Sequence, residues 1–169
     1  ISSAVLLVVI ITVAGSIVGI LCGYCQGKLD SFLMRLSDIF LAFPGMVFAI
    51  AAASVMSGGI MNAVAALAFI SWPKYARIAR SQVLTIKNAP YISAARLAGS
   101  GTGKIILKHI VPNIAGPVIV TAVLDIGTMM MEIAGLSFLG LGATPPTAEW
   151  GSMMSNGRSM LQTSPWIIL

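Results

Sequence analysis

The glycine-rich stretch Gly99-Ser100-Gly101-Thr102-Gly103-Lys104 is the first candidate for chemistry, because it is similar to a phosphate-binding loop. That pattern requires Gly, four residues, Gly, Lys and then Ser or Thr. In this chain Ala98 occupies the first glycine position, and Ile105 stands where a magnesium-binding hydroxyl is needed. No buried strand is predicted before the loop. We therefore interpret the stretch as a turn between two short helices, in which glycine supplies positive φ angles.

The second candidate is the segment Gly135-Leu136-Ser137-Phe138-Leu139-Gly140, which is close to the serine elbow of hydrolases but one residue too long. A serine nucleophile also needs a base. The only histidine of the chain is His109, which the topology derived below places at the opposite face of the membrane. An intramembrane serine protease is therefore disfavoured, and a metalloprotease is excluded because its pattern needs two histidines. We predict no catalytic residue and interpret His109 as a structural residue.

Sulfur ligands are present, but their pattern does not indicate a metal site. Cys22 and Cys25 have no second cysteine pair and no histidine beside them, so neither a zinc site nor a redox motif is supported. Both thiols are expected to be buried at a helix end. Thioethers favour Cu(I), but the consecutive residues Met129-Met130-Met131 would point in three directions on a helix and are interpreted as flexible packing. We predict no metal site and no cofactor.

Two acidic residues in an apolar region, Asp125 and Glu132, are candidates of another kind. An acid inside a membrane span is costly and by default faces a bundle interior or a water path. Seven residues separate the two acids, which places them on nearly the same helix face, about two turns apart. We predict that they line a translocation pathway. A hydrogen-bonded packing contact is the open alternative for Asp125, and interfacial solvation is the alternative for Glu132.

The composition of the chain, which is very hydrophobic and poor in charge, indicates which kind of elements positions these residues. Of the 169 residues 57% are hydrophobic and 9% are charged, and the mean hydropathy is +0.96. A soluble domain carries about 25% charged residues. We therefore predict an all-α, polytopic membrane protein, because an open sheet edge cannot face lipid. We attribute the net charge of +5 to membrane topology and contact with anionic lipid headgroups, and not to nucleic acid.

Membrane-crossing helices can be located because the hydrocarbon core, roughly 30 Å thick, needs about 20 apolar residues. A short polar connection is predicted over 31–38, with a helical turn on the membrane surface as the open alternative, and Pro73 is expected to kink the helix that contains it. The chain begins at Ile1 in apolar sequence and stops as another apolar run begins, so we expect a fragment of a longer protein. Five spans are predicted, near residues 4–24, 39–56, 60–82, 110–131 and 166 to the end.

The orientation of the spans follows from a basic region. Residues 74–108 contain seven Lys or Arg and no acid, which leaves three Lys or Arg for the rest of the chain. Because basic residues in short loops resist translocation, residues 88–109 are predicted to form a cytoplasmic loop. Alternation then places 132–165 on the outer side. A folded basic loop of this length is also suited to binding a cytoplasmic partner.

This loop resembles the EAA loop of bacterial ABC importer permeases, in which Glu-Ala-Ala is followed by three residues, Gly, and a hydrophobic pair ending in Pro. Here the pattern is Ser93-Ala94-Ala95, Arg96-Leu97-Ala98 and Gly99, with Pro112 thirteen residues later. Ser93 replaces the acidic first residue, and Val111 replaces the usual Leu. Further segments are similar to the dipeptide/oligopeptide/nickel permease family: Lys108 to Asn113, Leu136 to Gly142, Pro145-Pro146 and Glu149-Trp150-Gly151.

The resemblance is to the second, C-type permease subunit of that family, without its first span and much of its last. The runs Leu124 to Met130 and Thr147 to Gly151 look closest to nickel-transport permeases. The implied fold is the MetI-like transmembrane helix bundle of type I ABC importers, located in the bacterial plasma membrane. The implied function is ATP-driven import of nickel or short peptides by alternating access. An intramembrane enzyme and a passive channel are the competing classes.

The resemblance also implies partners and coupling residues. The partners are a second permease subunit in a heterodimer, two cytoplasmic ATPase subunits that hydrolyse the ATP, an extracytoplasmic substrate-binding protein and membrane lipid. Small residues on the loop would permit close approach of an ATPase, while Arg96 and Lys104 would pair with acidic groups on its rim. The implied ATPase-coupling residues are Ser93, Ala94, Ala95, Arg96, Gly99 and Lys104.

Overall fold

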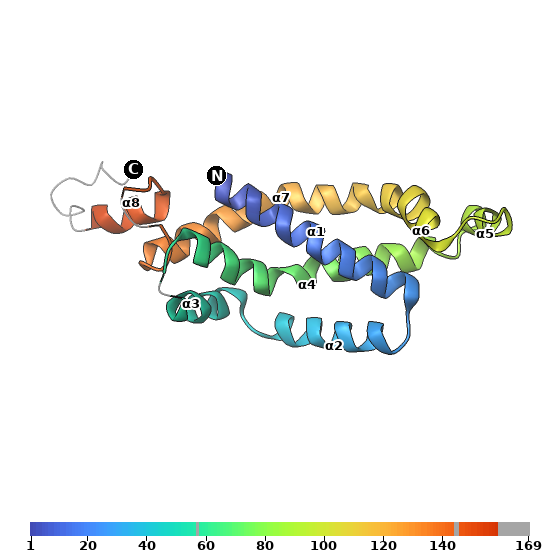
Figure 1. Cartoon of the computed structure of the whole chain (residues 1–169). Helices are drawn as coiled ribbons and strands as arrows, with labels where there is room; N and C mark the ends of the chain where they lie inside the picture. The colour runs from blue at the N-terminus through green and yellow to red at the C-terminus, as the bar shows by residue number, and fades with distance from the viewer. Residues whose placement is uncertain (57, 144–145, 159–169) are drawn as a thin grey trace. The chain divides into compact units, whose positions relative to one another are not determined.

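The computed structural model of this chain describes residues 1–56, 58–143 and 146–158. The predicted fifth span, near residue 166, lies outside the described residues. Among the described residues the regular structure is helical and no strand occurs, in agreement with the predicted all-α class (Figure 1). In chain order the helices are α1 (Ser2–Cys25), α2 (Lys28–Ala42), α3 (Gly45–Val55), α4 (Ile60–Ile86), α5 (Pro90–Leu97), α6 (Thr102–Ile105), the π-helix η1 (Ile106–Ile110), α7 (Val111–Phe138) and α8 (Trp150–Gly157).

The chain folds as two compact units, each assembled from separate segments. One unit comprises Ile1–Val8, Phe43–Ile70 and Asp125–Leu169, and the other comprises Val9–Ala42 and Ser71–Leu124. Helices α1, α4 and α7 each begin in one unit and end in the other. The whole basic region and the predicted cytoplasmic loop belong to the second unit, which therefore contains every predicted coupling residue.

Two stretches of the described chain are long and apolar enough to cross a membrane, by length and composition. They are α1 and the run 102–138, and the α2–α3 pair would be a third crossing if it is counted as one broken span. Helix α4 is not among them. It has 27 residues and contains Pro73 as expected, but its second half carries three basic residues, which lower its hydropathy: Lys74, Arg77 and Arg80.

The second predicted span is where the structure departs most from the sequence-based interpretation. We predicted a polar connection over 31–38 and one helix over 39–56. Instead, α2 is a continuous helix over Lys28–Ala42, and α3 follows it at an angle of 90°. Pro44 accounts for the break, because its backbone is extended, with φ −62° and ψ 114°, and because it disfavours a helical conformation in the residue before it.

Three glycines in α1 allow close packing on the second half of α4. Gly15, Gly19 and Gly23 recur at every fourth position, and α1 lies along α4 in Figure 1. A Cβ atom at Gly15 would lie 2.5 Å from the carbonyl oxygen of Trp72, and one at Gly23 would lie 2.8 Å from the Cβ of Val83. Small residues at this spacing let two helix backbones approach closely in a membrane. The spacing is visible in the sequence but did not enter our predictions.

A buried apolar cluster connects the second half of α4 with the predicted loop and the start of α7. Ile20 and Tyr24 of α1 pack against the cluster from the side. Removing such side chains from water is the main source of cohesion between short helices. The members of the cluster are Ala79, Val83, Ile92, Ile105, Ile110 and Ile114.

In the first unit, the chain after α7 is fixed by hydrogen bonds. The hydroxyl of Ser137 is buried and accepts a hydrogen bond from the backbone N–H of Ala143 at 3.1 Å, so this serine stabilises a turn. Glu149 caps the start of α8, because its carboxylate accepts hydrogen bonds from the N–H groups of Gly151 and Ser152 at 2.8 and 3.2 Å. The predicted outer segment therefore contains ordered structure.

Candidate functional site

The predicted cytoplasmic loop consists of two short helices and a turn, as the sequence indicated. Helix α5 begins with Pro90, whose fixed φ angle suits the first position of a helix. After α5 ends at Leu97, Gly99 adopts a left-handed conformation with φ +77°, and α6 begins at Thr102. Gly99 therefore makes the reversal between the two helices.

The surface of α5 combines one anchor with several outward-facing residues. Ile92 is completely buried and belongs to the apolar cluster. Ser93, Ala94 and Gly99 are exposed, and a Cβ atom at Gly99 would meet no other atom within 4 Å. Leu97 is 91% exposed, the largest exposed fraction of any large hydrophobic side chain in the described part of the chain. The exposed surface of α5 thus combines short side chains with Leu97, Tyr91 and Arg96.

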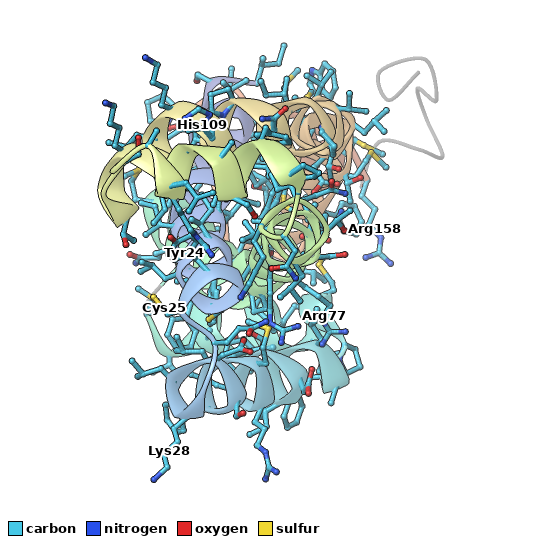
Figure 2. The ribbon with its side chains drawn as sticks, turned by 90° about the vertical axis from the view of Figure 1, so that its right-hand side faces the viewer. Tyr24, Cys25, Lys28, Arg77, His109 and Arg158 are labelled. Atoms are coloured by element: carbon cyan, nitrogen blue, oxygen red, sulfur yellow. The ribbon has the colours of Figure 1, made fainter. Side chains whose placement is uncertain are left out.

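Of the predicted coupling residues, Arg96 makes a contact that the sequence did not indicate. Its guanidinium carbon lies 5.7 Å from the centre of the Tyr24 ring, within the range of a cation–π interaction. Tyr24 is close to the last residue of α1 (Figure 2). This contact connects α5 to α1, and the pairing of Arg96 with acidic groups of a partner stays a prediction. Both Arg96 and Lys104 are exposed.

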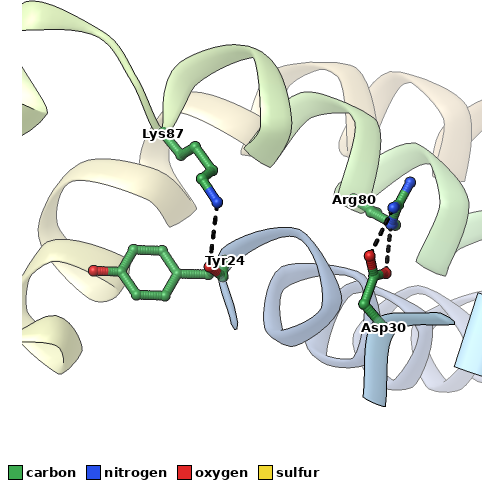
Figure 3. A network of polar contacts seen from close by, with 4 residues as sticks. All are labelled: Tyr24, Asp30, Arg80 and Lys87. Atoms are coloured by element: carbon green, nitrogen blue, oxygen red, sulfur yellow. Dashed lines mark hydrogen bonds and ion pairs between the residues drawn. The ribbon is translucent and has the colours of Figure 1, made fainter. Parts of the chain in front are cut away.

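Three further contacts involve the loop and the residues beside it. The amino group of Lys87 donates to the backbone carbonyl oxygen of Tyr24 at 3.4 Å (Figure 3). The rings of Tyr91 and His109 are 6.5 Å apart, and the side-chain amide of Asn113 donates to the carbonyl oxygen of His109. These contacts agree with a structural role for His109.

The basic region is partly neutralised by acids from another part of the chain. Arg80 donates to both carboxylate oxygens of Asp30, at 2.6 and 2.7 Å (Figure 3). Arg77 pairs with Asp38. Both acids lie in α2, so two of the basic residues of α4 hold α2 in place. The charge count of residues 74–108 alone did not reveal this compensation.

The two predicted pathway residues differ in burial. Asp125 is 4% exposed, whereas Glu132 is partly exposed, and both make contacts in the structure. The burial of Asp125 supports the packing contact that we kept as an alternative, and the pathway role of both acids stays a prediction. Within the described residues, no group of three or more His, Cys, Asp or Glu side chains could hold a metal ion.

The two cysteines also differ. Cys22 is buried, but Cys25 is exposed and both are free thiols (Figure 2). The prediction that both are buried is therefore wrong for Cys25. The reason is its position as the last residue of α1, where the helix leaves its packing partners.

Comparison with known protein families shows to which family the chain belongs. Residues 15–169 match the family described as "Binding-protein-dependent transport system inner membrane component". The chain belongs to this family. The fold class and the resemblance inferred from the EAA-like loop are thereby confirmed, and the loop lies inside the matched region.

Individual relatives differ in what they transport. The chain is 40% identical, over 92% of its length, to the dipeptide transport system permease protein DppC of Alkalihalophilus pseudofirmus. It is 39% identical over 92% to the glutathione transport system permease protein GsiD of Pectobacterium atrosepticum, and 37% identical over 89% to the nickel transport system permease protein NikC of Escherichia coli K12. The chain spans about half the length of these relatives, 51%, 52% and 54% respectively.

Proposed function

We propose that this chain is part of a permease subunit of an ATP-driven importer in the bacterial plasma membrane. The observation that carries the proposal is the folded helix–turn–helix α5–α6, which presents small exposed residues and is anchored to long apolar helices. The permease performs no chemistry itself and moves its solute by alternating access, while ATP is hydrolysed by partner subunits.

The surface of α5 suits docking into a groove of an ATPase subunit. Ser93, Ala94 and Gly99 are short enough to let the partner's surface approach the helix backbone. Leu97 supplies an apolar side chain for the floor of such a groove, and the exposed Lys104 can pair with an acidic rim. ATP-driven approach of two ATPase subunits would then move two such loops toward each other, which is a rigid-body switch.

The remaining partners follow from the same proposal. A second permease subunit would complete the pathway, and membrane lipid would surround the two. The ordered segment after α7, with α8 capped by Glu149, would face an extracytoplasmic substrate-binding protein. No nucleic acid takes part.

We propose short peptides as the cargo, because the dipeptide and glutathione permeases among the relatives transport peptide-like solutes. Nickel is the second candidate, supported by the identity of 37% to a nickel permease and by the resemblance of the runs Leu124 to Met130 and Thr147 to Gly151 to nickel-transport permeases. An experiment that separates the two is uptake of radiolabelled dipeptide and of radiolabelled nickel by vesicles that contain the full-length permease with its partner subunits.

The coupling role is tested by Gly99→Glu. A long acidic side chain at the exposed turn should block docking of the ATPase without disturbing the apolar helices. We expect transport to be lost while the permease remains folded and membrane-inserted. Wild-type transport together with normal co-purification of the ATPase would contradict the proposed coupling site.

A further inference from the structure

Tyr24 is the point at which three parts of the second unit meet. Its ring lies under the guanidinium group of Arg96 from α5, and its carbonyl oxygen accepts from Lys87, which follows α4. The same residue packs against the apolar cluster that contains Ile92. Figure 3 shows Tyr24 beside the end of α4, with Lys87 directed at its backbone.

The helix that carries Tyr24 is suited to transmit a displacement. Gly15, Gly19 and Gly23 hold α1 so close to α4 that a methyl group at any of these positions would overlap α4. The parts of the two helices that lie in the second unit, 9–25 and 71–86, are therefore tightly packed against each other. A force applied to the Tyr24 ring acts on this packed pair at the end of α1, one residue before the helix terminates.

The connection between Tyr24 and α2 is short and its backbone conformation is restricted. Gln26 and Gly27 both adopt left-handed backbone conformations, with φ 52° and 93°, and α2 starts immediately afterwards. Asp30 in the first turn of α2 is then held by Arg80. A left-handed conformation is uncommon for a residue other than glycine, so the corner at Gln26 is a defined turn between two anchored helices.

We propose that Tyr24 is a positioning residue for transport, which passes movement of α5 to the α1–α4 pair through Arg96. This inference rests on the proposed coupling role of α5 and adds the next connection inside the permease. It assigns Arg96 an inward role, toward α1, in place of an ion pair with the ATPase. The chemistry required of Tyr24 is an aromatic face, and its hydroxyl group is not needed.

The test uses the full-length permease assembled with its partner permease and ATPase subunits in proteoliposomes. The readouts are solute transported per ATP hydrolysed and the amount of ATPase that co-purifies. Tyr24→Leu and Arg96→Gln should each lower the transport-to-hydrolysis ratio, about two- to fivefold for the loss of one cation–π contact, without loss of ATPase. Tyr24→Phe keeps the aromatic face and should retain the wild-type ratio.

Three controls make the result decisive. Phe32→Leu removes an aromatic ring that is 64% exposed on α2 and should not change the ratio. The double variant with Tyr24→Leu and Arg96→Gln should be no worse than either single variant, because both remove the same contact. Gly99→Glu tests the coupling site itself, independently of Tyr24.

The outcomes separate the two proposals. A wild-type ratio for Tyr24→Leu, while Gly99→Glu uncouples transport, would overturn the role of Tyr24 and leave the coupling site standing. Loss of ATPase co-purification in Arg96→Gln, with Tyr24→Leu unaffected, would restore the outward role of Arg96. If neither Gly99→Glu nor Tyr24→Leu has an effect, the proposed coupling role of the loop is overturned, and the role of Tyr24, which rests on it, is overturned as well.

Discussion

Arg80 and Asp30 form a two-pronged ion pair in which Nε and Nη2 of the guanidinium group lie 2.6 and 2.7 Å from the two carboxylate oxygens. Fifty residues of sequence separate the partners, and the side chain of Asp30 is only 9% exposed. Planar, bidentate pairs of this kind are stronger and more directional than single contacts. The pair therefore fixes the start of α2 against α4 and sets the direction of the chain after α1.

The first prediction concerns this pair. Asp30→Asn leaves the partly buried Arg80 charged and without its anionic partner, so we expect the free energy of unfolding to fall by about 1–3 kcal/mol. Thermal unfolding of the purified permease in detergent would measure the loss. Asp38→Asn is the matched control, since its pair with Arg77 is exposed at 64% and 53%, where such pairs contribute about 0–1 kcal/mol. Equal losses in the two variants would contradict a special role for Asp30.

The second prediction tests the glycine contact between α1 and α4. Gly19→Ala should destabilise the permease by about 1–3 kcal/mol, because the new methyl group would overlap the backbone of Ala76. Gly127→Ala is the control: it lies in α7, and a Cβ atom there meets nothing within 4 Å in this chain. We expect it to be neutral or slightly stabilising, since alanine favours a helix over glycine by about 1 kcal/mol. The yield of folded protein and its unfolding temperature report both effects.

The third prediction isolates backbone conformation in the turn between α5 and α6. Gly99 has φ +77° and Gly101 has φ −67°, while neither position has an atom within 4 Å of an added Cβ. Gly99→Ala should therefore cost about 1–2 kcal/mol of local stability through strain, and Gly101→Ala should cost little. Hydrogen exchange of the α5 amides measures this directly, with faster exchange expected only for Gly99→Ala. Identical exchange in both variants would show that the turn can readjust.

The fourth prediction uses the native thiols to test the orientation in the membrane. Cys25 is exposed and Cys22 is buried, so an impermeant maleimide should label Cys25 alone, and only from the cytoplasmic side. In a background without either cysteine, Ser100→Cys should label from the same side and Thr147→Cys from the outside. Both substituted positions lie in the described chain, Ser100 within the predicted inner loop and Thr147 within the predicted outer segment. The reverse pattern at both would overturn the topology.

The sequence alone predicted those elements that are determined by residues close to one another in the chain. Apolar runs with at most one charge predicted α1 and most of α7, and the glycine-rich stretch that starts at Gly99 predicted a turn between two short helices. The residue spacing typical of the EAA loop, found in this part of the chain, also located the candidate coupling site. These features depend on residues that are close in the chain, which is why pattern alone could find them.

The features that were not predicted depend on contacts between residues that are distant in the sequence. Helix α2 was predicted as a connection because it carries charges, yet Asp30 and Asp38 are accommodated by arginines of α4. The position of Arg96 over Tyr24 likewise joins residues that no spacing rule relates. Charge pairs and ring contacts of this kind become visible only when the helices are packed.

The last prediction decides between the two interpretations of Asp125. Asp125 is a buried residue of α7, at 4% exposure, and it makes a contact within this chain. A packing contact can be kept by an amide of nearly the same shape, whereas leucine removes it and leaves its partner unsatisfied, at a cost of about 1–3 kcal/mol. We therefore expect Asp125→Asn to assemble and transport like the wild type, and Asp125→Leu to lower the yield of assembled complex.

Uptake of radiolabelled dipeptide and of radiolabelled nickel, each divided by the amount of assembled complex, separates transport from assembly in these variants. Glu132→Gln serves as the comparison, because Glu132 is on the same helix but partly exposed. If Asp125→Asn assembled normally but lost uptake of nickel and not of dipeptide, the carboxylate charge would have to act on the cargo. That result would favour the pathway role and a cationic cargo, because an amide of the same shape lacks only the negative charge.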